Sequence, residues 1–345
     1  MKLALKITPQ RSTQYAHLAE ALAVPELLAS PLAPLIRKVK QVKLGGQGYL
    51  LVEMEDAATS PSGTPDMPSP AQMAILSRLG ATSEIARYFD VICDIQGPFL
   101  QPLEPQFTPF VPLEMAEARR YKGKTSELFT QTLLNLAVFA GAYSDQLTGR
   151  LRILDPLSGG GTTLFLALAY GYDAFGIELN RQDVDTTAVF VQQYLKGEGI
   201  PFKEVDEHGR RAGRRDLFEI GRKGNTRTLV LTHGDTLQAD LHLREVPGGA
   251  RMHAIVGDLP YGIQHFGEVA SLLEKALPVW ERVLLPGGTL ALAWNATRCG
   301  REEMLGLLAR RSRLRPLNDP PYTQLAHAVD RVIKKRDILV AVKEQ

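Results

Sequence analysis

The sequence predicts an α/β protein whose larger part contains a mostly parallel sheet, with a smaller α+β domain in front of it. From residue 151 onward, short apolar runs alternate with helix-like segments, which is typical of a parallel sheet covered by helices. Acidic residues follow four of these predicted strands, at Asp155, Glu178, Asp235 and Asp258. In an open sheet of this kind ligands bind at the carboxyl ends of the strands, so the four acids predict one ligand site.

The N-terminal region predicts a small domain that mixes helices and strands. Residues 2–7 alternate apolar and charged side chains and residues 49–54 are mostly apolar, so both ranges predict strands. Residues 15–23 predict a helix, and residues 71–89 predict a helix in two pieces that is broken near Gly80. No chemical motif falls in this region, and substrate recognition is the role that we expect for it.

Two stretches of low apolar content or high proline content interrupt the first third of the chain. Residues 56–70 combine Pro, Ser, Thr and Gly with few large apolar side chains, which predicts a surface loop. Residues 91–95 predict a short strand, and the proline-dense range 98–118 predicts a linker. We therefore expect an N-terminal domain over residues 1–97 and a second domain over residues 119–345.

The second domain opens with a strand, a glycine-rich turn, a helix and a second strand. Residues 151–154 predict a buried strand, the three glycines at 159–161 a turn, and residues 162–170 a helix packed on the sheet. Residues 174–177 predict the next strand, with Glu178 at its tip. Glycines let a backbone approach a ligand closely, and a carboxylate in this place can accept hydrogen bonds from both hydroxyls of a ribose.

The spacing of the glycines excludes two common nucleotide sites. Thr162 and Thr163 follow Gly161 directly, so the turn lacks the GxGxxG pattern of nicotinamide and flavin proteins. The turn also lacks the GK[ST] that a triphosphate site requires. Asp155 also places an acid in the turn, where a pyrophosphate site would offer only donors. A cationic or neutral ligand therefore fits better than a pyrophosphate.

The alternation of helices and strands continues to the C-terminus. The predicted elements are a helix at 181–196, an insertion at 197–227, strands at 228–232 and 254–256, a helix at 268–284 and a strand at 289–294. Residues 328–333 and 337–342 predict a terminal hairpin, which would add an antiparallel strand to the sheet.

Four motifs of the second domain together resemble a known family. They are DPLSGGGT at 155–162, GIELN at 176–180, HGD at 233–235 and DLPYG at 258–262. This series resembles class I S-adenosylmethionine-dependent methyltransferases that methylate exocyclic amino groups. Within them it is most similar to the THUMP-associated nucleic-acid methylases, which include tRNA guanine-N2 methyltransferases.

The resemblance covers residues 119–345 and departs from the family at identifiable positions. The family's first motif is usually DPFCGSGT, and its catalytic motif is usually Asp-Pro-Pro-Tyr-Gly, where this chain has Leu259 in place of the first proline. No THUMP pattern is found before the proline-rich range. The implied fold is a Rossmann-like methyltransferase with a mostly parallel seven-stranded sheet and an antiparallel closing strand.

The family's cofactor, S-adenosyl-L-methionine, is the ligand that the resemblance implies. Glu178 would hold the ribose hydroxyls, Asp235 would accept from the adenine amino group, and the turn at 159–161 would lie under the methionine part. The implied cofactor-binding residues are Asp155, Pro156, Ser158, Gly159, Gly160, Gly161, Thr162, Glu178, Leu179, Asp235 and Thr236.

The implied catalytic residues are Asp258, Leu259, Pro260 and Tyr261. The Asp258 side chain and the backbone carbonyl of Leu259 or Pro260 would accept hydrogen bonds from the target amino group. An amino group on an aromatic ring is a poor nucleophile, because its lone pair is delocalised, and two acceptors turn that lone pair towards the methyl group. Tyr261 would stack on a base taken out of its own stack.

Basic residues concentrate in two clusters, one before the first motif and one in the insertion. Cations of this kind bind the phosphates of nucleic acids. The candidate contacts are Arg119, Arg120, Lys122, Lys124, Arg210 and Arg211, although acids interspersed in the insertion also fit a solvated loop.

The composition bounds the remaining possibilities. The two cysteines lie far apart and no Cys/His spacing suggests zinc, so we expect no metal and a reducing, cytoplasmic environment. The most apolar segment, 133–143, is too short to span a bilayer, so we expect no membrane partner. The expected function is methylation of an amino group of a base in RNA, with guanine N2 in tRNA favoured. DNA adenine-N6 or cytosine-N4 methylation, protein glutamine methylation and non-catalytic RNA binding stay open.

Overall fold

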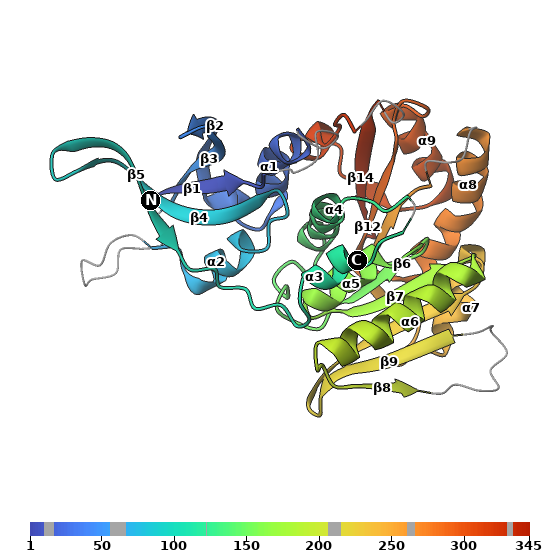
Figure 1. The fold of residues 1–345 in the computed structure, drawn as a ribbon. Coiled ribbons are helices and arrows are strands. Elements are labelled where there is room, and N and C mark those ends of the chain that lie inside the picture. Colours follow the sequence, from blue (N-terminus) through green and yellow to red (C-terminus); the bar gives the residue numbers. More distant parts are fainter. Residues whose placement is uncertain (10–16, 56–66, 122, 206–214, 261–265, 330–333) are drawn as a thin grey trace.

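Two sheets make up the computed structural model of the protein (Figure 1). The structure describes residues 1–9, 17–55, 67–121, 123–205, 215–260, 266–329 and 334–345. Within these residues, one sheet has five strands in the order β2-β3-β1-β4-β5, and the other has nine in the order β13-β14-β12-β11-β6-β7-β10-β9-β8.

The five-stranded sheet is antiparallel and belongs to the N-terminal region. Its strands are β1 (Lys2–Ile7), β2 (Ile36–Leu44), β3 (Gln47–Met54), β4 (Thr82–Ile92) and β5 (Ile95–Leu103), accompanied by helices α1 (Leu18–Ala29) and α2 (Pro70–Leu76). Leu3 and Leu5 of β1 are buried on the same face because strand side chains alternate, and they join one core with Leu22 of α1. The strands predicted at 2–7 and 49–54 are therefore present.

The second helical piece predicted within residues 71–89 is wrong, because residues 82–89 belong to β4. The backbone N–H groups of Gly80 and Ala81 donate to the buried Glu26 carboxylate at 2.9 Å each, which takes the chain out of the helix. A Cβ on Gly80 would lie 3.0 Å from the Leu128 carbonyl oxygen, so only glycine fits against the neighbouring helix. The β-branched and aromatic residues that follow then pair with β1 and β5, where such side chains pack well.

The predicted short strand at 91–95 is instead the end of one hairpin. Val91 and Ile95 belong to β4 and β5, and Cys93 and Asp94 between them have φ values of +48° and +62°, as a tight hairpin turn requires. Residues 98–103, expected as the start of a linker, complete β5. Because β5 lies at the edge of its sheet, its prolines are tolerated there.

The nine-stranded sheet forms the second part of the chain, with helices on both faces. Its strands are β6 (Arg152–Asp155), β7 (Asp173–Glu178), β8 (Phe202–Val205), β9 (Arg215–Arg222), β10 (Asn225–His233), β11 (Met252–Asp258), β12 (Leu284–Asn295), β13 (Arg315–Pro316) and β14 (Arg336–Val342). The helices are α3 (Glu114–Ala118), α4 (Glu127–Ala140), α5 (Thr162–Ala169), α6 (Arg181–Gly197), α7 (Ala239–Arg244), α8 (Phe266–Val283) and α9 (Arg301–Arg311). Short 3₁₀ turns occupy Ala33–Leu35, Thr236–Gln238 and Tyr322–Gln324.

The topology of this sheet confirms the predicted fold class. Strands β10, β7, β6, β11 and β12 run parallel, and β14 is antiparallel to both β12 and β13. The order of strands reverses at β6, which has β7 on one side and β11 on the other, and this is the switch point where such sheets bind ligands. The sheet has nine strands rather than seven because β8 and β9, from the predicted insertion, extend the edge beyond β10.

The predicted terminal hairpin is only half present among the described residues. Its second half lies in β14, which pairs with β12 and β13. Residues 328 and 329 form no strand, and residues 330–333 lie outside the described part of the chain. The antiparallel closing strand is nonetheless present, as expected.

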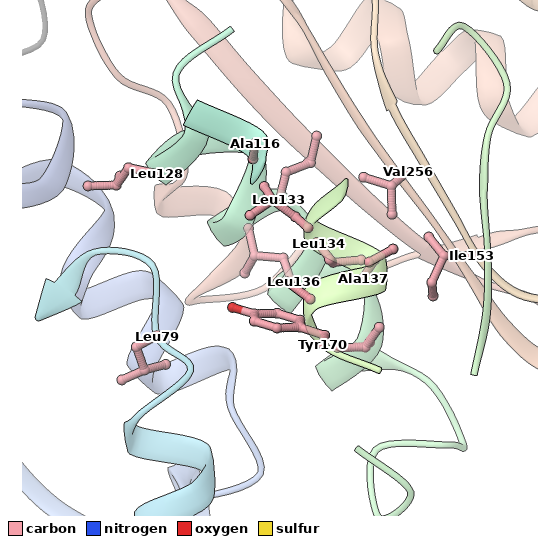
Figure 2. Packing of buried hydrophobic residues seen from close by; sticks show 14 of the residues in the cluster. Leu79, Ala116, Leu128, Leu133, Leu134, Leu136, Ala137, Ile153, Tyr170 and Val256 are labelled. Atoms are coloured by element: carbon pink, nitrogen blue, oxygen red, sulfur yellow. The ribbon is translucent and has the colours of Figure 1, made fainter. Parts of the chain in front are cut away.

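The N-terminal region and the second part share one hydrophobic core. Helix α4 lies between them, and Figure 2 shows Leu79 from the N-terminal region in the same cluster as Leu128, Leu133 and Tyr170. The Glu26 carboxylate also accepts a 2.8 Å hydrogen bond from the Asn135 side chain on α4. Burial raises the pKa of Glu26, and hydrogen bonds from Asn135, from the Gly80 and Ala81 backbone and from Thr132 oppose that rise. The described residues on both sides of the proline-rich range therefore pack as one body.

Candidate functional site

The acids predicted at the strand tips meet in one cavity of about 560 Å³. Asp155 ends β6, Glu178 ends β7, Asp235 follows β10 and Asp258 ends β11, and these strands are neighbours around the switch point. Of the predicted site residues, the cavity is lined by Asp155, Pro156, Ser158, Gly159, Thr162, Glu178, Leu179, Asp235, Thr236, Asp258, Leu259 and Pro260.

Each glycine of the turn between β6 and α5 has a structural reason. Gly159 and Gly161 have φ values of +47° and +88°, which side chains other than glycine rarely adopt. A Cβ on Gly160 would lie 2.4 Å from the ring of Tyr121, so this glycine lets the aromatic ring lie directly on the turn. The backbone here is thus shaped both by its own conformation and by close contact.

The Glu178 carboxylate is fixed by two backbone donors. Its Oε2 accepts from the Gly159 N–H at 2.9 Å, and its Oε1 accepts from the Asn180 N–H at 2.8 Å. The Ser158 N–H donates to the Ile177 carbonyl at 3.0 Å, which ties the turn to the preceding part of β7. Glu178 and the glycine turn therefore form one rigid unit at the rim of the cavity.

The tip of β10 is also held by side-chain contacts. Asp235 Oδ1 accepts from the Leu237 N–H at 2.9 Å and caps the 3₁₀ turn, while the Trp280 Nε1 donates to Thr236 Oγ1 at 2.9 Å. A Cβ on Gly234 would lie 2.3 Å from the His242 ring, so glycine is needed there too. These contacts fix the position of the β10 tip and of Asp235 at the cavity.

Asp155 is almost fully buried, at 4% exposure. Burial raises the pKa of its carboxyl from the ordinary 3.8 to about 7. Hydrogen bonds from Thr163 and from the Leu157 N–H, the latter at 3.0 Å, oppose the rise, and the negative charges of Glu178 and Asp258 add to it. A ligand that brought positive charge to this place would favour the ionised form.

Asp258 has a second, different environment at the tip of β11. Burial raises the pKa of its carboxyl to about 6, opposed by the positive charge of Arg336 and by the hydroxyl of Thr125. Thr125 Oγ1 donates to Asp258 Oδ2 at 2.6 Å. The next residue, Leu259, is buried, and its N–H donates to the Ala293 carbonyl at 2.9 Å. Pro260 is exposed, and Tyr261 lies outside the described residues.

The cavity wall also contains residues that the sequence did not predict, and three of them come from one segment. Tyr121, Thr125 and Thr130 come from the segment before and within the start of α4 and line the same cavity. The Tyr121 hydroxyl shares a 2.8 Å hydrogen bond with Thr162 Oγ1, and burial raises the pKa of Tyr121. The sequence signal for Tyr121 is its position as an aromatic residue within a run of four cations.

Two of the four cations of that segment, Arg119 and Lys124, are engaged within the chain. Arg119 Nη2 donates to Thr186 Oγ1 at 2.9 Å and its guanidinium lies 5.4 Å from the centre of the Phe190 ring. Lys124 forms a salt bridge with Glu127 and donates to the Glu117 carbonyl at 3.1 Å.

The remaining candidate contacts differ in what the structure describes. Arg120 is exposed, whereas Lys122, Arg210 and Arg211 lie outside the described residues. Phosphate contact by this set stays a prediction.

Neither a metal-binding cluster nor a membrane-spanning helix is found in the part of the chain that the structure describes. No three His, Cys, Asp or Glu side chains gather there in a way that could hold a metal ion. None of its helices combines the length and apolar character needed to cross a bilayer.

Comparison with known proteins yields structural similarity at low identity. No family model matches the chain, and no curated protein sequence matches it. TrmN from Thermus thermophilus is 13% identical, with a TM-score of 0.43 and coverage of 99% of each chain. The 16S rRNA N2 methyltransferase RsmC from T. thermophilus, solved with AdoMet and guanosine, is 18% identical with a TM-score of 0.37, over 90% of this chain and 59% of that one. An rRNA methylase from Streptococcus thermophilus is 16% identical with a TM-score of 0.33, over 58% and 91%. Similarity at this level establishes neither a family nor an activity.

Proposed function

We propose that the chain is an S-adenosylmethionine-dependent N-methyltransferase acting on an exocyclic amino group of a base in RNA. The observation that carries this proposal is the convergence of Asp155, Glu178, Asp235 and Asp258 in one cavity at a sheet's switch point. The cavity volume of about 560 Å³ lies within the range of ordinary cofactor sites.

The residues of the cavity fit this cofactor by their chemistry. Glu178 is held so that its carboxylate faces the glycine turn, and it suits two ribose hydroxyls; Asp235 suits an adenine amino group. Asp155 is buried with its pKa raised to about 7, so it is stabilised as an anion by a positively charged group such as a sulfonium or an ammonium. When bound, S-adenosylmethionine supplies an electrophilic methyl group.

Asp258 is the residue that we assign to the acceptor. Its carboxylate would accept a hydrogen bond from the target amino group, and the carbonyl of Leu259 or Pro260 would accept a second. Both acceptors draw the nitrogen lone pair out of conjugation with the ring, and the amino group loses a proton during or after the transfer. Leu259 in place of proline is compatible with this role because its side chain is buried and only its carbonyl is needed.

RNA is the proposed substrate, with guanine N2 in tRNA as the specific target. Two observations support this choice. The first is the order and the residues of the four motifs, and the second is the basic segment that contains Tyr121, a residue of the cavity wall. The shared core of α1 and α4 places the N-terminal region next to the catalytic part, which suits a role in substrate recognition.

Two measurements test the proposal in sequence. Calorimetry with S-adenosylmethionine should detect binding that Glu178→Ala weakens, and the absence of any binding to the wild-type protein would refute the proposal. Methyl transfer from labelled cofactor should then be measured into total tRNA, rRNA, DNA and protein, with Asp258→Ala as the inactive control. Incorporation into tRNA supports the full proposal. Label in DNA or protein alone, or binding without any transfer, would instead point to one of the other functions that the motifs leave open.

A further inference from the structure

Thr125 donates a hydrogen bond to the Asp258 side chain. Its Oγ1 lies 2.6 Å from Asp258 Oδ2, across 133 positions of sequence. A carboxylate has no proton to give, so the threonine hydroxyl is the donor whenever Asp258 is ionised. Because a carboxylate otherwise rotates readily about its last torsion, a short charge-assisted hydrogen bond fixes the plane of the Asp258 carboxylate.

The segment that carries Thr125 is anchored on both sides. Ahead of it, the Tyr121 hydroxyl is bonded to Thr162 at 2.8 Å. Behind it, the Ser126 carbonyl accepts from the Thr130 N–H at 3.0 Å, in the first turn of α4, and Lys124 pairs with Glu127. Helix α4 is itself packed in the core by side chains such as Phe129, so Thr125 is presented to Asp258 from a rigid support.

Charged and titratable groups surround Asp258 from several elements. Arg336 on β14 contributes positive charge, and its guanidinium lies 4.2 Å from the centre of the Phe129 ring. Asp155 on β6 and the Tyr121 hydroxyl lie on the cofactor side and sense the Asp258 charge. Arg336 and the Thr125 hydroxyl favour the ionised carboxylate, and burial disfavours it.

We propose that Thr125 is a positioning residue for the methyl-transfer reaction, holding the Asp258 carboxylate in the orientation and charge state that accepts the target amino group. The inference rests on the proposed function and adds to it a residue outside the motifs that carry the resemblance. Thr125 acts through Asp258, so its loss should reduce turnover without removing the cofactor site. The interaction also links the acceptor carboxylate to the segment whose Tyr121 covers the glycine turn.

The test compares Thr125→Val, which keeps shape and removes the donor, with Thr125→Ser, which keeps the donor. The Val variant should lose about tenfold or more in kcat, because misorientation of a reacting partner has effects of that order. Its KM for S-adenosylmethionine should stay within about twofold, as expected when a transition-state interaction alone is lost. The Ser variant should retain most of the wild-type kcat.

The pH profile supplies a readout that a general loss of structure would not produce. Loss of a donor to the ionised form raises the pKa of Asp258, so the acidic limb of kcat should move to higher pH by about one unit in the Val variant. It should not move in the Ser variant or in the control Thr148→Val, which changes an exposed threonine outside the cavity.

The outcomes separate this inference from the proposed function. Wild-type protein that binds no S-adenosylmethionine or transfers no methyl group refutes the function itself. Active wild-type protein together with an unchanged kcat and pH profile in the Val variant refutes the role of Thr125 alone, as does a Ser variant no better than Val. If the Val variant does not fold, Thr125→Ala, which introduces no new branch, is judged by the same kcat and pH readouts.

Discussion

Replacing Asp155 with asparagine should stabilise the protein without ligand, and increasingly so as the pH rises. Asparagine keeps an oxygen in the place where Asp155 Oδ1 accepts from the Leu157 N–H. It removes a carboxyl that is 4% exposed and must ionise in that buried place. An unpaired buried charge is costly, whereas a neutral amide with its hydrogen bond kept costs far less.

The magnitude follows from the pKa of Asp155, which burial raises from 3.8 to about 7. Because the folded state binds this proton more tightly than the unfolded state, the wild-type protein loses stability as the pH rises from about 4 to about 7, and the loss is complete above that window. Each unit of pKa difference corresponds to about 1.4 kcal/mol, so the loss between pH 5 and pH 8 is about 2 to 3 kcal/mol. The asparagine does not titrate, so its advantage over Asp155 should grow by that amount.

Urea denaturation of both proteins at pH 5 and pH 8, without cofactor, measures this difference. The exposed Asp145→Asn variant serves as the matched control, and its effect on the unfolding free energy should be about 0.5 kcal/mol or less, as is usual for surface substitutions. A difference in unfolding free energy between Asp155→Asn and wild type that stays constant from pH 5 to pH 8 would show that the carboxyl does not titrate in this window. In calorimetry the same variant should bind S-adenosylmethionine more weakly, because the buried negative charge is gone.

Three further changes test other parts of the structure. Glu178→Gln keeps the size but removes the charge of a carboxylate fixed by two backbone donors, and calorimetry should show cofactor affinity reduced about 10- to 100-fold, or 1.4 to 2.7 kcal/mol. Gly160→Ala places a Cβ 2.4 Å from the Tyr121 ring and should lower stability by about 1 to 3 kcal/mol in urea denaturation, a loss that Tyr121→Ala in the same chain should largely relieve. Glu26→Ala leaves two backbone N–H donors and one side-chain amide buried without their acceptor, so it should lower the free energy of unfolding by about 3 kcal/mol or more. The control Glu20→Ala changes a half-exposed side chain and should lower it by about 0.5 kcal/mol or less.

The parts of the site that the sequence predicted well are those that depend on local order along the chain. A parallel strand must be followed by a turn at its carboxyl end, so the residue after each apolar run is assigned to the ligand side of the sheet without any knowledge of packing. Asp155, Glu178 and Asp258 each end their strand in the structure, and Asp235 follows β10. The glycine turn between β6 and α5 is local in the same sense.

The errors in the N-terminal region arise where local pattern leaves two structures possible. Residues 82–89 contain enough apolar side chains for a helix face, and what makes them a strand is pairing with β1 on one side and β5 on the other. The pairing with β1 joins residues 75 to 84 positions apart, from Ile7 opposite Thr82 to Leu3 opposite Arg87. The prolines of β5 likewise suggested a linker, because a sequence does not show that a strand lies at the edge of its sheet.

Tyr121 and Thr125 mark the limit of inference from motifs, and they also explain how the site tolerates its own charge. Four carboxylates line one cavity. Burial raises the pKa of both Asp155 and Asp258, and the negative charges of Glu178 and Asp258 raise the pKa of Asp155 further. Glu178 accepts hydrogen bonds from Gly159 and Asn180, which lie 19 and 2 positions away in the chain. Asp258 instead accepts from a hydroxyl 133 positions earlier and senses the charge of Arg336 on the closing strand. The proposed cofactor end of the cavity is thus formed by the segment from β6 to the start of α6, while the proposed acceptor end is assembled by the tertiary fold. We therefore expect a protein with the same motifs but without a donor at position 125 to bind S-adenosylmethionine normally and to transfer its methyl group slowly.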